Sequence, residues 1–347
     1  MIKNWIKILK QMQSENPDWL DPRYKNIDKA IYDDESFWKY VAMLGMGRTF
    51  QYAGDVIKKN KEIILNCLRM DGEVFQHISD DLRADEEIAM LAIMKSYRNL
   101  EYVSEELRGE FEFVKKAIIV DGNALEYASE DLRQNHNLVL LAVKRFGLAL
   151  QYADDDLKNN LDIVMAAIRQ NGDALEYADE ELQSNREVVL EAVSRNYTAL
   201  KYASEDLRGD KEIVFQALLL DGDAIEYATK AIKADKDIAM LAVTLSGNAL
   251  EFIDKKLRSD KSIAKAAVAR SGRSYEYIDK TLKADKEIAT LALADWGWDI
   301  YQNAAKELKI DKDTVLLALT KDPDNLKCVD KELRKEADII DWLKLVS

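Results

Sequence analysis

A pattern of 25 residues repeats along most of this chain and constrains its fold more than any other feature. The stretch Ala-Leu-Glu-Tyr-Ala-Ser-Glu-Asp-Leu-Arg at residues 124–133 returns in nearly the same form at residues 174–183 and 199–208. Ten copies run without a gap over residues 48–297, and two looser copies follow a one-residue insertion at Trp298. A fixed period of this length is typical of a solenoid, because each unit is too small to bury its own apolar residues and must stack on its neighbours.

The second half of each copy predicts one helix. We number the 25 positions of a copy so that Arg48 occupies position 1. Positions 16, 17, 20 and 21 are apolar in almost every copy, and this spacing corresponds to one face of a helix. Asp or Asn at position 13, as in Asp85 and Asn135, suits the N-cap of a helix of about ten residues. The Gly at position 25, as in Gly122, is expected to adopt a left-handed C-cap conformation.

The first half of each copy predicts shorter segments. Positions 2–6 form one or two turns, and Ser or Asp at position 7 caps a further turn that ends near the Leu at position 10. We expect Leu at positions 3 and 10 and Tyr at position 5 to stack on their equivalents in adjacent copies. The predicted fold class is therefore all-α, an α-solenoid of twelve repeats with one longer helix and one short helix or 3₁₀ turn each. We expect a curved rod with a right-handed superhelix.

Both ends of the chain depart from the pattern and are expected to act as caps. Residues 1–47 predict an N-terminal capping helix, over 1–22, and a degenerate repeat in which Trp38 takes the place of an Ile. Residues 48–297 make up the ten regular repeats, and residues 298–347 hold two irregular repeats that form the C-terminal cap. Terminal repeats need caps because one of their apolar faces has no neighbour.

The pattern resembles a known repeat family. The resemblance depends on the stretch at residues 124–133, on Asp-Lys-Glu-Ile-Val at residues 210–214 and on the pair Ala217-Leu218. Over about residues 48–347 the chain is similar to the family called domain of unknown function 4116. This resemblance implies a helical repeat, and it brings no catalytic residues.

Three residues depart from that family pattern. Tyr97 and Tyr197 stand at the Gly position, and Phe252 stands at the Tyr position. The two copies after Trp298 are also irregular.

The net charge of -14 limits the kinds of partner. Direct binding to nucleic acid is not expected, because such proteins carry basic surfaces that neutralise phosphates. An anionic membrane surface is disfavoured for the same reason, and no stretch approaches the roughly 18 apolar residues of a membrane span. The charge favours a protein partner that is itself basic. A cytoplasmic location is expected, or the host cytosol if the protein is a secreted effector.

No motif for chemistry is present in the sequence. His77 and His136 lie more than two repeats apart, so they cannot share a metal ion. No Gly-rich phosphate-binding motif occurs. We therefore expect no catalytic residue, no cofactor and no metal, and we expect the protein not to be an enzyme. The Glu at position 4, as in Glu126 and Glu176, is expected to face solvent or to pair with Arg or Lys at position 11.

Position 8 changes charge along the chain. It is acidic in every copy as far as Glu205 and Lys from Lys230 onward. Capping explains the acids, which interact favourably with a helix N-terminus, but it does not explain the Lys residues. Either position 8 is an exposed edge whose residue type varies without a function, or it forms a ridge that binds a partner. That partner is a long protein with two charge zones or a second copy of the chain, bound head to tail. The acidic residues that we predict to bind a partner are Glu105, Glu130, Asp155, Glu180 and Glu205.

Two further features predict contact with a partner. At position 23, Arg145, Arg195 and Arg270 alternate with apolar residues on an otherwise solvated line, and both residue types are enriched at interfaces. Trp296, Trp298 and Tyr301 interrupt the period near the C-terminus, and this joint is either a bend or a docking point.

Three functions remain open from the sequence. The first is a non-enzymatic scaffold that binds a partner protein along the solenoid surface. The alternative is an acidic inhibitor or effector, of viral or pathogen type, that blocks the basic nucleic-acid-binding groove of a target protein. The third, an enzyme with an unrecognised site, would have its site at residues 295–303.

Overall fold

The chain is an all-α repeat solenoid, as predicted. The computed structural model describes residues 29–295, 300–302 and 304–346, and no β-strand occurs in these ranges. The capping helix predicted for residues 1–22 lies outside them. The chain divides into two compact units, Met1–Gln170 (unit 1) and Asn171–Ser347 (unit 2). The number of repeats and the handedness of the superhelix stay predictions.

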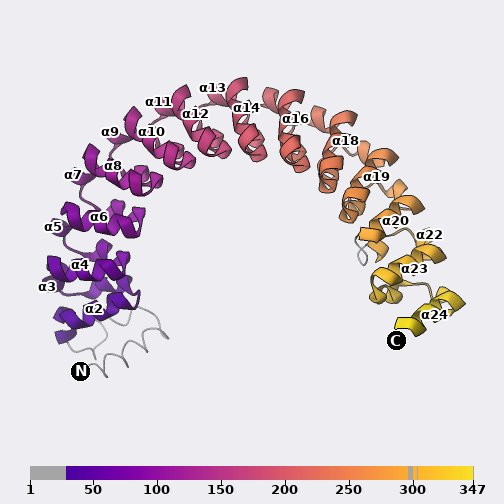
Figure 1. The fold of residues 1–347 in the computed structure, drawn as a ribbon, viewed down its shortest axis with the longest axis horizontal. Coiled ribbons are helices and arrows are strands. Elements are labelled where there is room, and N and C mark those ends of the chain that lie inside the picture. Colours follow the sequence, from indigo (N-terminus) through magenta and orange to yellow (C-terminus); the bar gives the residue numbers. More distant parts are fainter. Residues whose placement is uncertain (1–28, 296–299, 303, 347) are drawn as a thin grey trace. The chain divides into compact units, whose positions relative to one another are not determined.

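Each regular repeat contains a 3₁₀ helix, a short α-helix and a long α-helix in that order. In a representative repeat of unit 1 these are η6 (Gly122–Tyr127), α9 (Glu130–Arg133) and α10 (His136–Arg145). Within each unit, the short α-helices follow one edge and the long helices lie beside them (Figure 1). The prediction of one longer helix with a short helix or 3₁₀ turn in each repeat is confirmed.

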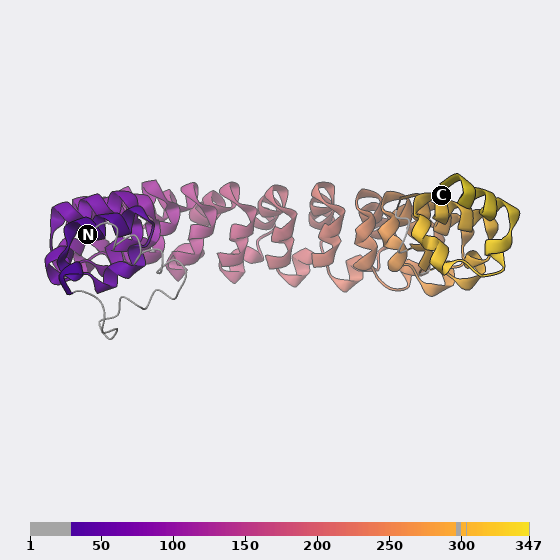
Figure 2. The same ribbon diagram turned by 90° about the horizontal axis from the view of Figure 1, so that it is seen from below.

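The other elements keep this order. In unit 1 they are η2 (Lys29–Asp33), α2 (Glu35–Met43), η3 (Gly47–Tyr52), α3 (Asp55–Lys58), α4 (Lys61–Met70), η4 (Gly72–His77), α5 (Asp80–Arg83), α6 (Glu86–Lys95), η5 (Tyr97–Tyr102), α7 (Glu105–Arg108), α8 (Phe111–Val120), η7 (Gly147–Tyr152), α11 (Asp155–Lys158) and α12 (Leu161–Gln170). In unit 2 they are η8 (Gly172–Tyr177), α13 (Glu180–Gln183), α14 (Arg186–Arg195), η9 (Tyr197–Tyr202), α15 (Glu205–Arg208), α16 (Lys211–Leu220), η10 (Gly222–Tyr227), α17 (Lys230–Lys233), α18 (Lys236–Leu245), η11 (Gly247–Glu251), η12 (Leu257–Ser259), α19 (Lys261–Arg270), η13 (Gly272–Glu276), η14 (Lys280–Leu282), α20 (Lys286–Asp295), α22 (Lys306–Lys309), α23 (Lys312–Lys321), η15 (Pro323–Cys328), η16 (Leu333–Lys335) and α24 (Ala337–Val346). Figure 2 shows the successive repeats of each unit from a second direction.

The long helices begin and bury their apolar face as the sequence predicts. The Asp85 carboxylate accepts hydrogen bonds from the backbone N–H groups of Glu87 and Ile88, and Asn135 caps α10 in the same way. The apolar positions of α6 are fully buried, and they are Ile88, Ala89, Ala92 and Ile93. Position 13 is therefore the N-cap, and positions 16, 17, 20 and 21 form the core face.

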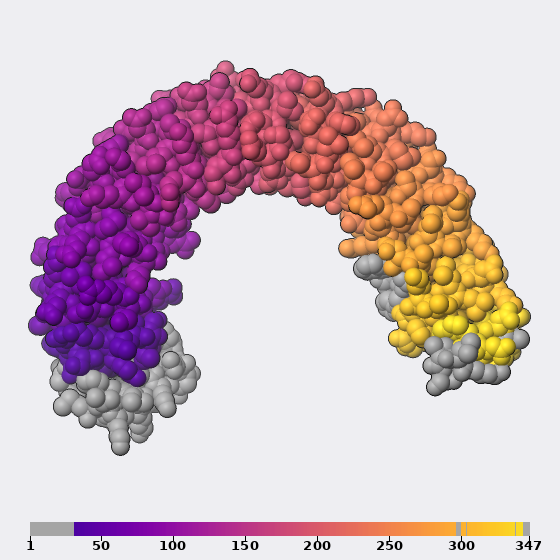
Figure 3. Space-filling view, viewed as in Figure 1, coloured from indigo at the N-terminus to yellow at the C-terminus, as the bar shows by residue number. Residues whose placement is uncertain are grey.

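The core of each unit runs between the long helices and the 3₁₀ helices. Leu100, Leu125 and Leu150, at position 3, are fully buried, and successive 3₁₀ helices of unit 1 contact one another. Side chains close the gaps between the ribbons of neighbouring repeats (Figure 3). The tyrosines at position 5, such as Tyr102 and Tyr127, are only half-buried. The prediction that they belong to the core is wrong in this respect, because the hydroxyl of each ring reaches the surface.

The degenerate first repeat keeps this core. Trp38 is fully buried, and its indole N–H donates a hydrogen bond of 2.9 Å to the carbonyl of Tyr32. Its ring meets that of Phe50 edge to face, with 5.0 Å between the centroids. Cys67 is also buried, and burial raises the pKa of its thiol to about 12.

Backbone hydrogen bonds link neighbouring repeats at the short helices within each unit. In unit 1 the N–H of Ser129 donates to the carbonyl of Arg108 at 3.0 Å, so that position 7 contacts position 11 of the preceding repeat. In unit 2 the N–H of Ser204 donates to the carbonyl of Gln183, also at 3.0 Å. Because these bonds involve only backbone atoms, they do not depend on which side chain occupies the position.

The glycines at position 25 do not have the predicted left-handed conformation. Gly45 alone among the described glycines has a positive φ, at 68°. A Cβ added to Gly122 would lie 2.7 Å from the carbonyl oxygen of Ala142 in the next repeat. Gly222 and Gly247 approach Ala242 and Ala267 in the same way. Position 25 therefore favours Gly because neighbouring repeats approach closely there, which the sequence pattern alone did not distinguish from a C-cap.

The edge of short helices changes where position 8 becomes Lys. Lys255, Lys280 and Lys331 belong to repeats in which a three-residue 3₁₀ helix, η12, η14 or η16, replaces the short α-helix. A cation at a helix N-terminus interacts unfavourably with the helix dipole. Lys230 and Lys306 still begin four-residue α-helices. The Lys therefore weakens this helix without abolishing it.

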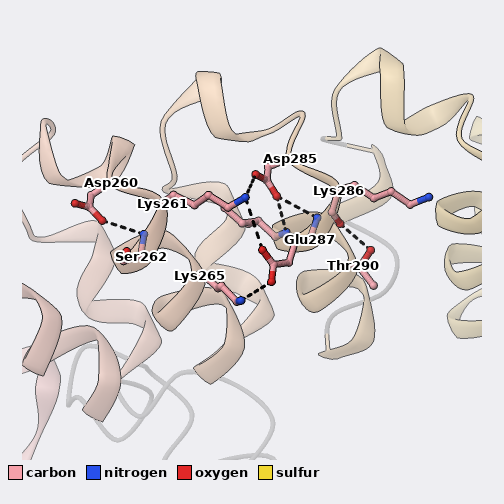
Figure 4. A network of polar contacts seen from close by, with 9 residues as sticks. Asp260, Lys261, Ser262, Lys265, Asp285, Lys286, Glu287 and Thr290 are labelled. Atoms are coloured by element: carbon pink, nitrogen blue, oxygen red, sulfur yellow. Dashed lines mark hydrogen bonds and ion pairs between the residues drawn. The ribbon is translucent and has the colours of Figure 1, made fainter.

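A row of ion pairs joins the long helices of unit 2. The ammonium of Lys236, at position 14, lies 2.6 Å from a carboxylate oxygen of Asp260 in the next repeat, and Lys261 lies 2.6 Å from Asp285. Lys265 reaches Glu287 beside the second pair, and Figure 4 shows the contacts that Lys261 and Lys265 make with Asp285 and Glu287. Each N-cap carboxylate therefore receives backbone N–H groups of its own helix and a cation from the preceding repeat.

Candidate functional site

The 3₁₀ helices of unit 1 form a polar and aromatic surface, which we call the 3₁₀ face. Positions 1, 4 and 5 of each repeat contribute to it. Position 1 usually holds a charged or polar residue, position 4 holds a Glu or Gln in most copies, and position 5 usually holds a Tyr. Tyr102, Tyr127 and Tyr152 are half-buried on successive repeats. Because positions 4 and 5 recur at each repeat, the same pair of functional groups recurs along this face.

The Glu at position 4 binds the Tyr of the next repeat. The hydroxyl of Tyr202 donates a hydrogen bond of 2.7 Å to Glu176, and Tyr277 bonds to Glu251 in the same register. In unit 1, burial and the nearby Glu126 carboxylate raise the pKa of Tyr127, in the same repeat, and of Tyr152, in the next repeat. These bonds place a row of carboxylates and phenols at the junctions between repeats.

The expected pairing of position 4 with position 11 takes another form. The guanidinium of Arg83 donates to the main-chain carbonyl of Gln76 at 2.9 Å, and the ammonium of Lys233 donates to that of Glu226 at 2.6 Å. The cation at position 11 thus binds the backbone at position 4 of its own repeat, which leaves the side chain at position 4 available to the next repeat.

A hollow of about 1200 Å³ opens on the 3₁₀ face of unit 1. Tyr97 and Tyr127 lie side by side in it, with ring centroids 6.3 Å apart and planes inclined by 35°. Tyr97 stands at the position where most copies have Gly, so its ring is an addition to the regular surface. The other side chains that line the hollow include Glu73, Glu101, Tyr102, Glu126 and Tyr152.

The hollow contains charged side chains of both signs. The acids Asp71, Glu73, Glu101 and Glu126 line it together with the bases Arg48, Lys95 and Arg98. Burial and the neighbouring Glu126 carboxylate raise the pKa of Tyr127 and of Tyr152 to about 12, so both hydroxyls stay protonated at neutral pH. Glu73 pairs with Arg48 at 3.1 Å. Glu101 has no hydrogen-bond or ion-pair partner in the part of the chain that the structure describes.

Unit 2 has an equivalent tyrosine pair. The rings of Tyr197 and Tyr227 stack with centroids 6.5 Å apart and an interplanar angle of 29°. Position 4 of that repeat is Lys201, whose ammonium lies 4.4 Å from the centroid of the Tyr202 ring. Asp173, at position 1 of the preceding repeat, accepts a hydrogen bond of 2.6 Å from the hydroxyl of Thr198. Here the chain itself supplies both a cation and donors for the nearby carboxylate.

The acidic residues predicted to bind a partner lie elsewhere, on the edge of short helices. Each is exposed and begins a four-residue helix, with Glu105, Glu130 and Asp155 in unit 1 and Glu180 and Glu205 in unit 2. Asp155 pairs with Lys158 of its own helix at 3.1 Å. These residues line up along each unit. In unit 1 the edge meets the 3₁₀ face, where Asp80 and Glu105 line a second hollow of about 480 Å³ together with Glu101 and Tyr102.

The position-23 residues are exposed, and two of them have partners within the chain. Arg145 is exposed at the end of α10. Arg195 pairs with Glu191 at 3.0 Å, and the guanidinium of Arg270 donates to the carbonyl of Leu245 at 3.2 Å.

Of the aromatic residues at the joint near the C-terminus, the structure describes Tyr301, which does not lie on the predicted contact surface. Trp296 and Trp298 lie outside the described residues. Tyr301 is fully buried, and its hydroxyl donates to the carbonyl of Lys309 at 3.2 Å. Tyr275, at position 3 of an earlier repeat, is also buried and bonds to Lys283 in the same way. Tyr301 is therefore a core residue, because the one-residue insertion restores it to position 3.

The described residues contain no group of three or more His, Cys, Asp or Glu side chains that could hold a metal ion. Burial and nearby cations lower the pKa of His77 to about 4, so its imidazole is neutral at physiological pH. None of the helices in the described ranges has the length and apolar character needed to cross a membrane.

The pairing of Tyr97 with Tyr127 was missed in the sequence. The signal was present, since two regular copies have Tyr at the Gly position, namely Tyr97 and Tyr197. The sequence could not show that a residue at position 25 meets a position-5 Tyr that lies 30 residues further along the chain.

Comparison with known protein families gives one result. The sequence model of a family described as a domain of unknown function, DUF4116, matches six times in tandem, at residues 42–83, 85–133, 135–183, 185–233, 235–283 and 285–334. A full match begins at the N-cap of a long helix and spans two of the 25-residue copies. No curated protein and no solved structure matched significantly.

Proposed function

Because this chain belongs to the DUF4116 family of helical repeats, we propose that it is a non-enzymatic scaffold that binds a basic, extended segment of a partner protein on the 3₁₀ face. Tandem repeats in an all-helical fold suit a protein-interaction scaffold, since a solenoid offers a long surface with one set of functional groups at each repeat. A partner that lies along the repeats meets a Glu-Tyr or Gln-Tyr pair at most of the junctions.

The hollow on the 3₁₀ face of unit 1 carries this proposal. It combines tyrosine rings, which are enriched in protein interfaces, with the carboxylates of Glu73, Glu101 and Glu126. Half-buried tyrosines supply contact area with little loss of side-chain entropy on binding. Carboxylates beside them favour Lys and Arg of the partner, which agrees with the net charge of -14.

A binding experiment with matched charge changes tests this face. A fluorescein-labelled peptide made of Gly-Ser-Arg repeats is titrated with the wild-type chain, with Glu101→Lys/Glu126→Lys and with Glu105→Lys/Glu130→Lys. Both variants change the net charge equally. Each also introduces a residue native to the same position elsewhere, namely Lys201 and Lys230, so both are expected to fold.

The proposal predicts that the first variant loses at least about tenfold in affinity, since it reverses charges at the contact surface. The second variant is expected to lose less than about threefold, because Glu105 and Glu130 do not line the hollow beside Tyr97 and salt weakens the effect of exposed charges outside the contact. Equal losses in the two variants, or no binding to the wild-type chain, would overturn the proposal.

A second candidate surface is the acidic edge of short helices. Its carboxylates are exposed, with 97% of the Asp155 side chain accessible, and they would suit the basic groove of a nucleic-acid-binding protein. This edge predicts the opposite result in the same titration, with binding lost in Glu105→Lys/Glu130→Lys and kept in Glu101→Lys/Glu126→Lys.

A further inference from the structure

The two tyrosine pairs occupy equivalent places in the repeat but differ in charge. Tyr97 and Tyr197 both stand at the position that most copies give to Gly, and each contacts a position-5 Tyr 30 residues further along the chain, Tyr127 or Tyr227. At position 4 of the copy that follows, unit 1 has Glu101 and unit 2 has Lys201. The aromatic surface is thus common to both units, and the charge beside it is reversed.

In unit 2 the chain provides its own cation. The Lys201 ammonium lies 4.4 Å from the Tyr202 ring centroid, within the range of a cation–π interaction. The contact shows that the face of a position-5 Tyr is accessible to an ammonium group in this fold.

In unit 1 the cation is absent from the equivalent place. Tyr102 has Glu101 where Tyr202 has Lys201, and Glu101 has no partner among the described side chains. Arg98 lies 5.9 Å from the centroid of the Tyr97 ring, beside Tyr97 and not in the place of Lys201. The hollow of about 1200 Å³ leaves room for a further side chain.

We infer that the hollow beside Tyr97, Tyr102 and Tyr127 receives a cationic side chain of the partner segment, with Glu101 as its counter-ion. This inference rests on the proposed function and identifies the anchor of the bound segment. Arginine binds there more tightly than lysine, because a planar guanidinium stacks on an aromatic ring and donates two parallel hydrogen bonds to a carboxylate. A guanidinium is also more weakly hydrated than an ammonium.

Two substitutions test the anchor with residues that the fold already uses. Tyr97→Gly restores the residue found at position 25 in most copies, and Glu101→Lys reproduces the arrangement of Lys201. Binding is measured by fluorescence anisotropy with two labelled peptides, one of Gly-Ser-Arg repeats and one of Gly-Ser-Lys repeats. The wild-type chain should bind the Arg peptide about three- to tenfold more tightly. In Tyr97→Gly this preference should disappear, and Glu101→Lys should lower the affinity for both peptides.

The reciprocal variant Lys201→Glu should create a second anchor. It removes the internal cation and places a carboxylate beside Tyr197, Tyr202 and Tyr227, as in unit 1. The Arg peptide should then bind with a higher stoichiometry in isothermal titration calorimetry. Circular dichroism at the same concentrations checks that each variant keeps the helical content of the wild type.

The possible results separate this inference from the proposed function. An Arg preference that persists in Tyr97→Gly, while Glu101→Lys/Glu126→Lys still binds weakly, overturns the anchor and leaves the 3₁₀ face as the binding surface. A Lys201→Glu variant with unchanged stoichiometry also contradicts the anchor. Absence of binding of both peptides to the wild-type chain overturns the proposed function and the anchor together.

Discussion

Units 1 and 2 use the same repeat but differ in how their long helices are joined. In unit 2, position 14 is Arg or Lys in each regular copy, and Lys236 and Lys261 pair with the N-cap Asp of the next repeat. In unit 1, Lys61 makes such a pair with Asp85, but position 14 of the following copies holds Glu86, Phe111, His136 and Leu161. The long helices of the regular copies nevertheless have 10 residues each in both units.

This difference separates the interactions that hold the repeats together from those that modify them. The buried positions of the long helices and the backbone bonds between short helices occur in both units. They are therefore sufficient to stack the repeats. The ion pairs of unit 2 are exposed, and exposed pairs contribute little to stability and weaken in salt. The following predictions test this division, from the largest expected effect to the smallest.

The close contact at position 25 should be equally important in both units. Gly122→Val and Gly222→Val each add a branched side chain against the backbone of the next repeat. Each should lower the free energy of unfolding in urea by about 2–4 kcal/mol, as overpacking against a rigid neighbour does. Gly109→Ala is the matched control, because its added Cβ would lie 3.5 Å from the nearest atom. If only one of the two Val variants has a lower free energy of unfolding, the repeats stack differently in the two units.

Removing the ion pairs should affect only unit 2. The variant Lys211→Ala/Lys236→Ala/Lys261→Ala should speed hydrogen exchange in α16, α18 and α19 by roughly two- to fivefold at low salt. Exchange in α8 and α10 should not change. At high salt the variant and the wild type should become indistinguishable in all these helices. If hydrogen exchange in the variant stays faster than in the wild type at high salt, the Lys side chains stabilise unit 2 by packing.

Acid should weaken unit 1 at a pH that leaves unit 2 intact. The pKa of His77 falls from 6.5 in the unfolded chain to about 4 in the fold, so the unfolded state binds the proton first as the pH falls. The stability that His77 contributes is present above pH 6.5 and is lost between about 6.5 and 4. Hydrogen exchange in η4 and α5 should therefore quicken over this range, and His77→Tyr, which restores the usual residue, should abolish that response. If hydrogen exchange in His77→Tyr still quickens over this pH range, the carboxylates and not His77 cause the effect.

Adding the missing pair to unit 1 should have the smallest effect. Phe111→Lys/Asn135→Asp creates at one junction the arrangement of Lys236 and Asp260. Exchange in α10 should slow by less than about twofold at low salt, and the gain should disappear at high salt. The single variant Phe111→Lys is the control, since Asn135 has no charge.

The sequence was sufficient to predict the elements of the repeat. Position 13 and the apolar face behind it identified the long helix, because capping and burial are local properties that recur in each copy. Trp38 was assigned to the position of an Ile for the same reason. The two regular features that were misinterpreted, Gly122 and its equivalents and the position-5 tyrosines, both depend on contacts with the next repeat.

The candidate site was less predictable for the same physical reason. The charge of position 8 is visible in the sequence, so we predicted that the exposed edge with Glu105 and Asp155 binds a partner. The hollow beside Tyr97 depends on which positions of neighbouring repeats face each other, and a period of 25 residues does not specify that. Tyr301 shows the converse case, in which a residue that looks irregular in sequence is restored to the core by a one-residue insertion.

Photo-cross-linking tests the central claim most directly. A Gly-Ser-Arg repeat peptide with a photoreactive group at its centre is irradiated with the full chain, and the adducts are located by mass spectrometry. Binding on the 3₁₀ face predicts adducts on η5 and η6, within Tyr97–Tyr102 and Gly122–Tyr127, and their loss in Glu101→Lys. Adducts concentrated on α7 and α9, within Glu105–Arg108 and Glu130–Arg133, would contradict it.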